Sequence, residues 1–413
     1  MFKTNKMMGL AAGFCLLLGS ARLAYGDSSE IASKDSAEEK WDINIPHVPS
    51  DTIGFEATEG TWITVDVSPD GRELVFDLLG DIYKMPITGG DAVLLSGGLA
   101  YEVPPRFSPD GKKILFTSDR GGGDNIWMMN ADGGERVQIT KEDFRLLNNA
   151  AWHPSGEYLV AKKHFTSERS MGAGEMWLYK VPEGGAGVQL MKRKNDQQDA
   201  NEPVFSPDGK YLYWAEDMSP GPYFQYNKDP NGTIYVIRRL DLRTNEVQNI
   251  IEINGGACRP QISPDGKTIA FVRRVRSKSV LSLFNLHTGL IRHLWDGLDE
   301  DQQEVWALFG VYPGFSWTPD GKNIVIWAKG KIWRVEVASG APTEIPFRVH
   351  VTQTVAKALR FPQQIGADQF PVKAIRWPQM TPDRREVVFQ ALGYLYRQEM
   401  SSGNPVRITK QTD

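Results

Sequence analysis

The chain has 413 residues, of which 41% are hydrophobic, 10% are aromatic, 40 are glycine and 25 are proline. This composition can supply a large core and is typical of many short strands separated by turns. The formal net charge is −4 at pH 7, and this mildly acidic balance argues against a general nucleic-acid-binding protein.

The first 26 residues have the pattern of a secretory signal peptide. Lys3 and Lys6 precede an apolar run at residues 7–18, and Ala24-Tyr25-Gly26 favours cleavage before Asp27. The run is too short for a convincing membrane span. We therefore expect an exported protein, periplasmic or secreted, with no membrane span and with residues 27–50 as a flexible linker. Cys258 is the one cysteine of the mature chain, so no internal disulfide is expected.

A tetrapeptide of the Ser-Pro-Asp-Gly type recurs seven times along the mature chain, at intervals of 40 to 63 residues. An aromatic or apolar segment precedes each copy, an alternating strand follows it, and a further strand surrounds an aromatic residue or leucine. A Gly-rich turn then leads to a last strand. The copies begin at Ser68, Ser108, His153, Ser206, Ser263, Thr318 and Thr381.

Four strands per repeat with a base period near 40 residues predict an all-β fold, a β-propeller of four-stranded antiparallel blades. About seven repeats are visible in residues 51–413, and the sequence leaves open whether the ring is complete. Asp51 to Thr58 could supply an outer strand ahead of the first inner strand.

The recurring tetrapeptide is predicted to be a hairpin turn rather than a catalytic site. Proline presets φ at the second turn position, and glycine accepts the left-handed conformation at the fourth. Asp110 and its copies are therefore interpreted as turn residues. The last copy has Arg384 in place of glycine, so a strained or differently shaped turn is expected there.

The connections that grow between repeats all lie on one face of the predicted ring, which is where a rigid scaffold usually carries function. Three of them are chemically distinctive and could bind a carboxylate-bearing ligand or dock another domain. Surface arginines and loop aromatics are more often structural, and that alternative stays open. The candidate residues are His164, Arg169, Tyr223, Phe224, Tyr226, Arg273, Arg274 and Arg276.

The motifs of several enzyme classes are absent from the sequence. The chain contains no G-x-S-x-G nucleophile elbow, no H-E-x-x-H, no His-x-His and no Walker loop. Its six histidines are scattered. The sequence therefore predicts no catalytic residue and no metal ligand in this chain.

The repeats resemble the TolB-like propeller, also described as WD40-like or PD40, through Ser-Pro-Asp-Gly with Phe-Thr-Ser-Asp-Arg and Asp-Asn-Ile-Trp. More specific segments are similar to the N-terminal propeller region of exported bacterial amidohydrolases: residues 66–90, 117–133, 140–149 and 271–281. The resemblance implies a metal-dependent hydrolase barrel after the propeller, with a divalent metal such as zinc. Its His-x-His motif has no match here, so the chain is expected to be a fragment or truncated product that lacks the catalytic domain.

Three hypotheses about function follow. The chain is a non-catalytic propeller that gates substrate or docks the catalytic domain of an amidohydrolase-like enzyme; or it is a free-standing TolB-like periplasmic module for protein partners; or it is the propeller of a serine peptidase, where it filters peptides. The expected partner is accordingly a C-terminal hydrolase domain or a protein or peptide ligand.

Overall fold

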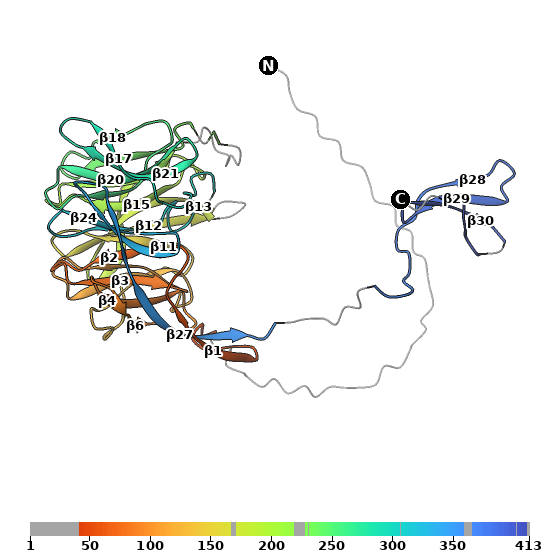
Figure 1. The fold of residues 1–413 in the computed structure, drawn as a ribbon, viewed down its shortest axis with the longest axis horizontal. Coiled ribbons are helices and arrows are strands. Elements are labelled where there is room, and N and C mark those ends of the chain that lie inside the picture. The colour runs from red at the N-terminus through yellow and green to blue at the C-terminus, as the bar shows by residue number, and fades with distance from the viewer. Residues whose placement is uncertain are drawn as a thin grey trace, which may run out of the picture. The chain divides into compact units, whose positions relative to one another are not determined.

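The computed structural model describes residues 41–166, 171–218, 228–229, 231–305, 307–358, 366–401 and 403–410. Within these ranges all the regular secondary structure is β-strand, and there is no helix that could cross a membrane. Six four-stranded antiparallel sheets follow one another along the chain as blades 1 to 6 (Figure 1).

The strands of the six blades are β2 (Val65–Val67), β3 (Glu73–Leu78), β4 (Asp81–Pro86) and β6 (Val93–Ser96); β7 (Glu102–Phe107), β8 (Lys113–Ser118), β9 (Asn125–Asn130) and β10 (Val137–Gln138); β11 (Leu146–Trp152), β12 (Tyr158–Thr166), β13 (Met171–Lys180) and β14 (Gly184–Met191); β15 (Ala200–Phe205), β16 (Tyr211–Asp217), β17 (Tyr235–Asp241) and β18 (Val247–Ile251); β19 (Cys258–Ile262), β20 (Thr268–Val275), β21 (Lys278–Asn285) and β22 (Ile291–Trp295); and β23 (Ser316–Trp317), β24 (Asn323–Ala328), β25 (Lys331–Glu336) and β26 (Pro342–Ile345).

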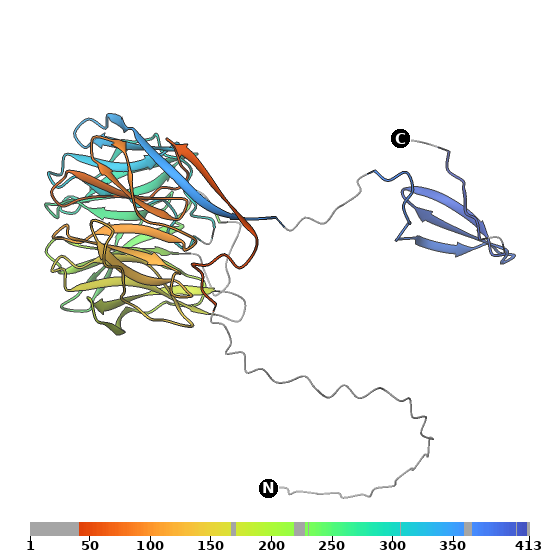
Figure 2. The same cartoon turned by 90° about the horizontal axis from the view of Figure 1, so that it is seen from below.

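The six blades close a ring. Each inner strand contacts the next blade, and β2 of blade 1 contacts β23 and β24 of blade 6 (Figure 2). The amide of Val65 donates to the carbonyl of Gly314 at 3.0 Å, and Gly60 N–H donates to the carbonyl of Gly330 at 2.9 Å. The predicted four-stranded blades are thus confirmed, and the closure that the sequence left open is reached with six of them.

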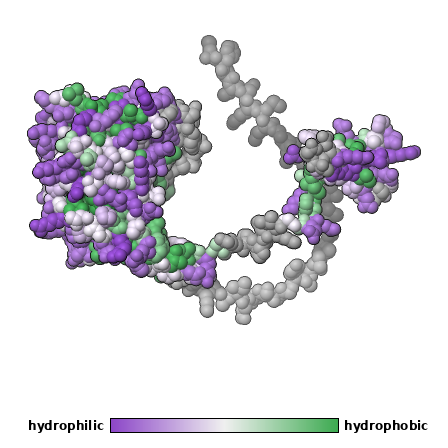
Figure 3. Space-filling view, viewed as in Figure 1, coloured by the Kyte–Doolittle hydropathy of each residue, from purple (hydrophilic) through white to green (hydrophobic). Residues whose placement is uncertain are grey.

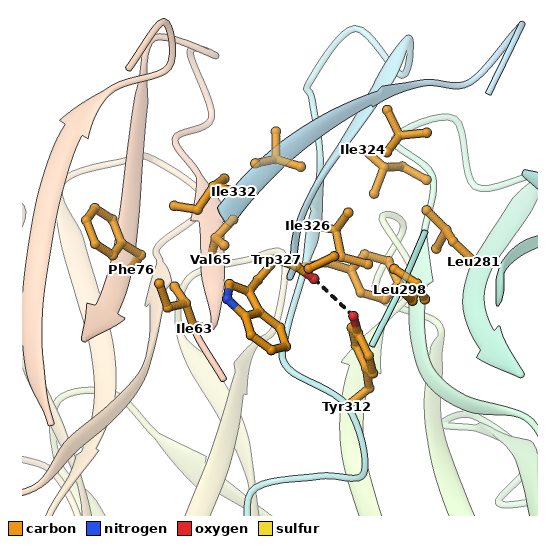
Figure 4. Close-up of a cluster of buried hydrophobic side chains, with 14 of the residues drawn as sticks. Ile63, Val65, Phe76, Leu281, Leu298, Tyr312, Ile324, Ile326, Trp327 and Ile332 are labelled. Atoms are coloured by element: carbon orange, nitrogen blue, oxygen red, sulfur yellow. Dashed lines mark hydrogen bonds between the residues drawn. The ribbon is translucent and has the colours of Figure 1, made fainter. Parts of the chain in front are cut away.

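Buried apolar side chains fill the junction between blades 6 and 1. Ile63, Val65 and Phe76 of blade 1 lie in one cluster with Ile326 and Trp327 of blade 6 (Figure 4). The indole N–H of Trp327 donates to the carbonyl of Gly60 at 2.7 Å. In the same cluster the hydroxyl of Tyr312 donates to the carbonyl of Trp327 at 3.0 Å. This junction is packed like the interior of a domain, so the ring needs no additional blade to close it.

The seventh repeat forms a sheet of its own, β28 (Arg376–Met380), β29 (Glu386–Ala391), β30 (Tyr394–Glu399) and β31 (Val406–Arg407). The chain divides into two compact units, residues 1–355 and residues 356–413, and this sheet lies in the second. The range 51–413, expected as one propeller, therefore comprises a closed ring and a separate four-stranded unit, which we call unit 2.

A third kind of sheet joins the two ends of the ring-forming segment. It has the order β1 (Ser50–Ala57), β27 (Phe347–Ala356) and β5 (Gly90–Asp91), with β27 parallel to β5. The segment expected as an outer blade strand is thus β1, and its partner is β27 rather than a blade. The ring surface in view is mainly polar, and hydrophobic side chains gather beside β1 and β27 (Figure 3).

The tetrapeptide turns have the structure that their residues predict. The Ser108 hydroxyl donates to Asp110 Oδ1 at 2.6 Å, and it accepts the amide of Lys113 at 2.9 Å. The hydrogen bond from the Ser108 hydroxyl, together with that from the amide of Lys112, holds the pKa of Asp110 below its usual value. Asp110 is therefore a turn residue, as predicted.

Arg384 occupies the left-handed position of the last turn with φ +56°. The turn keeps its hydrogen bonds, because Arg384 N–H donates to the carbonyl of Thr381 at 2.8 Å. The shape is thus unchanged, and the strain resides in a non-glycine residue at positive φ, which costs about 1–2 kcal/mol.

We expect Arg384→Gly to stabilise unit 2 by about 1 kcal/mol and Gly321→Ala, at φ +69° in blade 6, to destabilise the ring by about the same amount. A Cβ at Gly321 would meet its nearest atom at 3.9 Å, so backbone conformation alone sets that cost. Urea unfolding followed separately for the two units checks both values. If neither substitution changed the free energy of unfolding, these turns would carry no strain.

Candidate docking face at the channel mouth

One long connection of the ring crosses the mouth of its central channel. The connection from blade 5 to blade 6 contains residues 301–314, which we call the strap; Trp306 within it lies outside the described residues. The strap leaves blade 5 and hydrogen-bonds to blades 3, 4 and 5 before it enters blade 6. It therefore crosses the mouth of the channel on the face of the long connections.

Blade 3 holds the middle of the strap with a buried lysine. Lys162 Nζ lies 2.6 Å from Asp199 Oδ2 and donates to the carbonyl of Leu308 at 3.3 Å. Asp199 also accepts the amide of Gly174 at 2.8 Å. Burial lowers the pKa of Lys162, and the carboxylate of Asp199 opposes that shift. A charge as deeply buried as that of Lys162 needs such a partner.

Asparagine side chains extend this contact to blade 4. Asn149 Nδ2 donates to Asn201 Oδ1 and, at 3.3 Å, to the carbonyl of Leu308. Asn201 Nδ2 donates to the carbonyl of Ala307 at 3.0 Å. Two neighbouring strap carbonyls thus accept hydrogen bonds from inner strands of two blades, which fixes the path of the strap backbone.

The second half of the strap is fixed by a buried ion pair. Arg259 of blade 5 lies 3.5 Å from Glu202 of blade 4, and its guanidinium donates to the carbonyls of Phe309 and Tyr312 at 2.7 Å each. Glu202 accepts the amide of Val311 at 2.8 Å. Arg259 and Glu202 therefore form a connected network with the strap backbone that leaves few polar atoms unpaired.

The first residues of the strap are anchored to β20. Arg274 lies 2.7 Å from Asp301 and also pairs with Glu304. The hydroxyl of Ser279 donates to Asp301 Oδ2 at 2.7 Å. The hydrogen bond from Arg274 holds the pKa of Glu304 below its usual value. Arg274 is therefore committed to the strap.

Asp77, at the end of β3, is a buried carboxyl near the same mouth. Burial raises the pKa of Asp77 to about 7, although the amide of Thr64, which donates to it at 2.9 Å, and the charges of Arg106 and Arg259 act in the opposite direction. The folded protein consequently retains a proton at Asp77 that the unfolded chain releases near pH 4.

Asp77 makes the ring less stable as the pH rises. Its stabilising contribution is complete below about pH 4 and is lost as the pH approaches 7, because only the folded state binds the proton in this window. We compare the native protein with the Asp77→Asn variant, which keeps an acceptor for the amide of Thr64. Relative to this variant, the free energy of unfolding of the native protein should fall by up to about 1.4 kcal/mol per pH unit. Urea unfolding from pH 4 to 8 measures this difference. A difference that stayed constant or grew with pH would contradict it.

Four of the eight predicted site residues lie in the part of the chain that the structure describes. His164 is buried on β12 and hydrogen-bonds to Asn148 at 3.2 Å. Arg273 and Arg274 lie on β20 rather than in a loop, because β20 and β21 form a long hairpin. Arg273 donates to the carbonyl of Asn254 at 2.8 Å, and Arg276 is exposed in the hairpin turn. Arg169, Tyr223, Phe224 and Tyr226 lie outside the described residues.

Sequence reasoning missed the residues that hold the strap. Asn149, Glu202 and Arg259 occupy the same position in successive inner strands, each at positive φ beside a break in strand register. A signal was present in the sequence, because a polar residue stands near the start of each of these three inner strands. This signal is found when the repeats are aligned on their inner strands rather than on their turns.

The arrangement is suited to holding the backbone of the strap. Lys162, Arg259 and Arg274 donate to strap carbonyls or to carboxylates. In the part of the chain that the structure describes, no three His, Cys, Asp or Glu side chains gather as a metal site would require. The zinc implied by the amidohydrolase resemblance is expected in the catalytic domain after the propeller, not among these residues. Burial raises the pKa of the Cys258 thiol well above its usual value, so it is a poor nucleophile.

Two surface grooves lie on the opposite face, between neighbouring turns. One of about 780 Å³ is lined by the turns of blades 5 and 6 and by Trp317, and another of about 610 Å³ by those of blades 2 and 3 and by Trp152. Both tryptophans donate their indole N–H to a carbonyl of the preceding blade. These grooves are consequences of blade packing.

Comparison with known proteins finds similarity to the propellers of several proteins. Residues 62–257 match the model of the tricorn protease N-terminal beta propeller domain. The Tol-Pal system protein TolB of Helicobacter hepaticus is 30% identical over 192 residues, which are 46% of this chain and 42% of that protein. The uncharacterized peptidase YuxL of Bacillus subtilis is 25% identical over 185 residues, which are 45% of this chain and 23% of that protein.

Solved structures agree at the level of the fold. TolB from Acinetobacter baumannii matches with a TM-score of 0.51 and 17% identity, over 71% of this chain and 66% of that chain. The tricorn protease matches with a TM-score of 0.51 and 16% identity, over 86% of this chain and 32% of that chain. The predicted β-propeller fold is thereby confirmed, with TolB among the proteins that share it. The chain spans half or less of the length of the relatives that it matches in sequence.

Proposed function

We propose that this chain is an exported, non-catalytic propeller module whose long-connection face docks, and gates access to, a hydrolase domain of the metal-dependent amidohydrolase type. The observation that carries the proposal is the strap, which is held across the channel mouth by buried charges of three blades. A mouth built in this way presents a rigid surface for another domain. The secretory pattern of residues 1–26 supports export.

The names of the relatives support a hydrolase partner. They include a tricorn protease and a peptidase, in which the matched propeller segment is a minor part of a longer protein. A second candidate, a TolB-like module for protein partners, is favoured by the 30% identity to TolB. The reading frame after codon 413 separates these hypotheses: His-x-His supports the first, a stop codon the second, and G-x-S-x-G a serine peptidase.

The docking face can be tested with two exposed apolar residues that serve as a matched pair. Phe144, with 64% of its surface exposed, lies in the connection from blade 2 to blade 3, and Leu290, with 70% exposed, lies in a hairpin turn on the opposite face. Tagged protein recovered from its host should carry amide-hydrolysing activity. Phe144→Glu should lower this associated activity by about tenfold or more, because a charge at the centre of an interface is costly, and Leu290→Glu should leave it unchanged.

The outcomes separate docking from catalysis. The purified chain alone, supplied with Zn²⁺, should not hydrolyse amide or cyclic-amide substrates. Turnover by the isolated chain that chelation abolishes would overturn its non-catalytic role. Equal loss of associated activity in both variants, or no associated activity in the native preparation, would overturn docking through this face.

A further inference from the structure

Unit 2 has the internal construction of a ring blade. Its turn at residues 381–384 makes the same hydrogen bonds as the turns of the ring. Its first strand, β28, breaks register between Arg376 and Gln379. Trp377 stands there at φ +49°, as Arg259 does at φ +51° in the inner strand of blade 5. Such a break bends an inner strand at the channel, so β28 is shaped as the inner strand of a propeller.

The surfaces that a ring blade buries are exposed in unit 2. Counted from the turn, each residue of unit 2 corresponds to the residue 63 positions earlier in blade 6, whose strands pair in the same register. Three apolar positions change from buried to exposed. The pairs are Met380 and Trp317 (52% against 8% exposed), Leu395 and Ile332 (43% against 0%), and Ile408 and Ile345 (44% against 3%).

These positions lie on both faces of the sheet. Met380 pairs with Val387 across the strands, which places it on one face, and Gln390 pairs with Leu395 on the other. In blade 6 the corresponding second strand, Ile324 to Ala328, is buried on both faces by its neighbours. Each face of unit 2 therefore has, among its own residues, apolar positions that correspond to a blade-to-blade contact in blade 6.

The ring of residues 1–355 has no vacancy for this blade, because blade 6 and blade 1 already cover each other. We infer that residues 376–407 are one blade of a second β-propeller, and that each face of unit 2 docks a further four-stranded blade with a turn of the Ser/Thr-Pro-Asp-Gly type. The six blades of the ring supply the precedent, since each covers its neighbours through the same positions. This inference is independent of the proposed function.

The test places a photo-crosslinking amino acid, p-benzoylphenylalanine, on each face of unit 2. Met380 and Leu395 are the two positions, and exposed Leu290 on the ring is the control, in the full chain expressed in its native host. The crosslinked peptides are identified by mass spectrometry. Hydrogen exchange of β29 and β30 amides verifies that each variant retains the fold of unit 2.

The expected result is that both Met380 and Leu395 crosslink to peptides of β-blades that carry such a turn and lie outside residues 41–355, whereas Leu290 does not. Crosslinks to the ring itself, to unit 2 of a second copy or to a protein without propeller blades would overturn the inference. The absence of any crosslink from variants with a folded unit 2 would overturn it as well.

Discussion

Arg259→Met is expected to lower the free energy of unfolding of the ring by about 3–5 kcal/mol. The substitution leaves Glu202 as a buried charge without its partner, and such losses have this size. It also removes the donors to the strap carbonyls of Phe309 and Tyr312. Urea unfolding of the ring, followed by tryptophan fluorescence, measures the change.

Two controls separate the ion pair from the loss of side-chain volume. Arg276→Met replaces an exposed arginine and should change stability by less than about 0.5 kcal/mol. Arg259→Met combined with Glu202→Gln removes both charges and should recover a large part of the loss, because an uncompensated buried charge no longer remains. A double variant as unstable as Arg259→Met alone would contradict the role assigned to this pair.

Trp327→Ala should destabilise the ring by about 3–5 kcal/mol, the usual cost of truncating a large buried aromatic side chain. Trp327 is 4% exposed, contacts Trp62 and Tyr312, and donates to the carbonyl of Gly60 across the junction of blades 6 and 1. The loss should appear in the thermal unfolding of the ring.

Trp377→Ala is the matched control for this substitution. Trp377 is 72% exposed in unit 2, so its removal should leave the unfolding of the ring unchanged within about 0.5 kcal/mol. If Trp327→Ala were equally mild, the junction of blades 6 and 1 would not be the contact that closes the ring.

The blades could be predicted from the sequence because their determinants are local. Pro109 and Gly111 set the backbone conformation of the turn, and Asp110 accepts hydrogen bonds from residues on either side of it. One repeat is therefore sufficient to specify a hairpin. The alternation of residues 113–118 then assigns the following strand. Equivalent residues give the same result in every copy, including the one that ends at Arg384.

The channel mouth could not be predicted in the same way. Arg274 was a sensible ligand candidate as an arginine in a long connection, yet its carboxylate partners lie 27 and 30 residues further along the chain. His164 was expected at a surface and is buried beside Asn148. Contacts of this kind depend on how the strap crosses the ring, which no local pattern encodes.

The number of blades in the ring was also beyond local analysis. The repeat at Thr381 has the same turn and strand pattern as that at Thr318, and it forms the same sheet. Whether it enters the ring depends on the twist of the blades and on the junction at Trp327, which are properties of the whole ring. The exposure of Leu395 and Met380 is the structural consequence.

Hydrogen exchange compares β24 with its counterpart β29 and tests the six-bladed ring most directly. A ring that six blades close predicts that β24 amides, at residues 323–328, exchange only on global unfolding of the ring. Those of β29, at residues 386–391, should exchange faster by about a hundredfold or more, because a single uncovered sheet has little stability of its own. Equal protection of both strands would contradict the six-bladed ring with a separate seventh repeat.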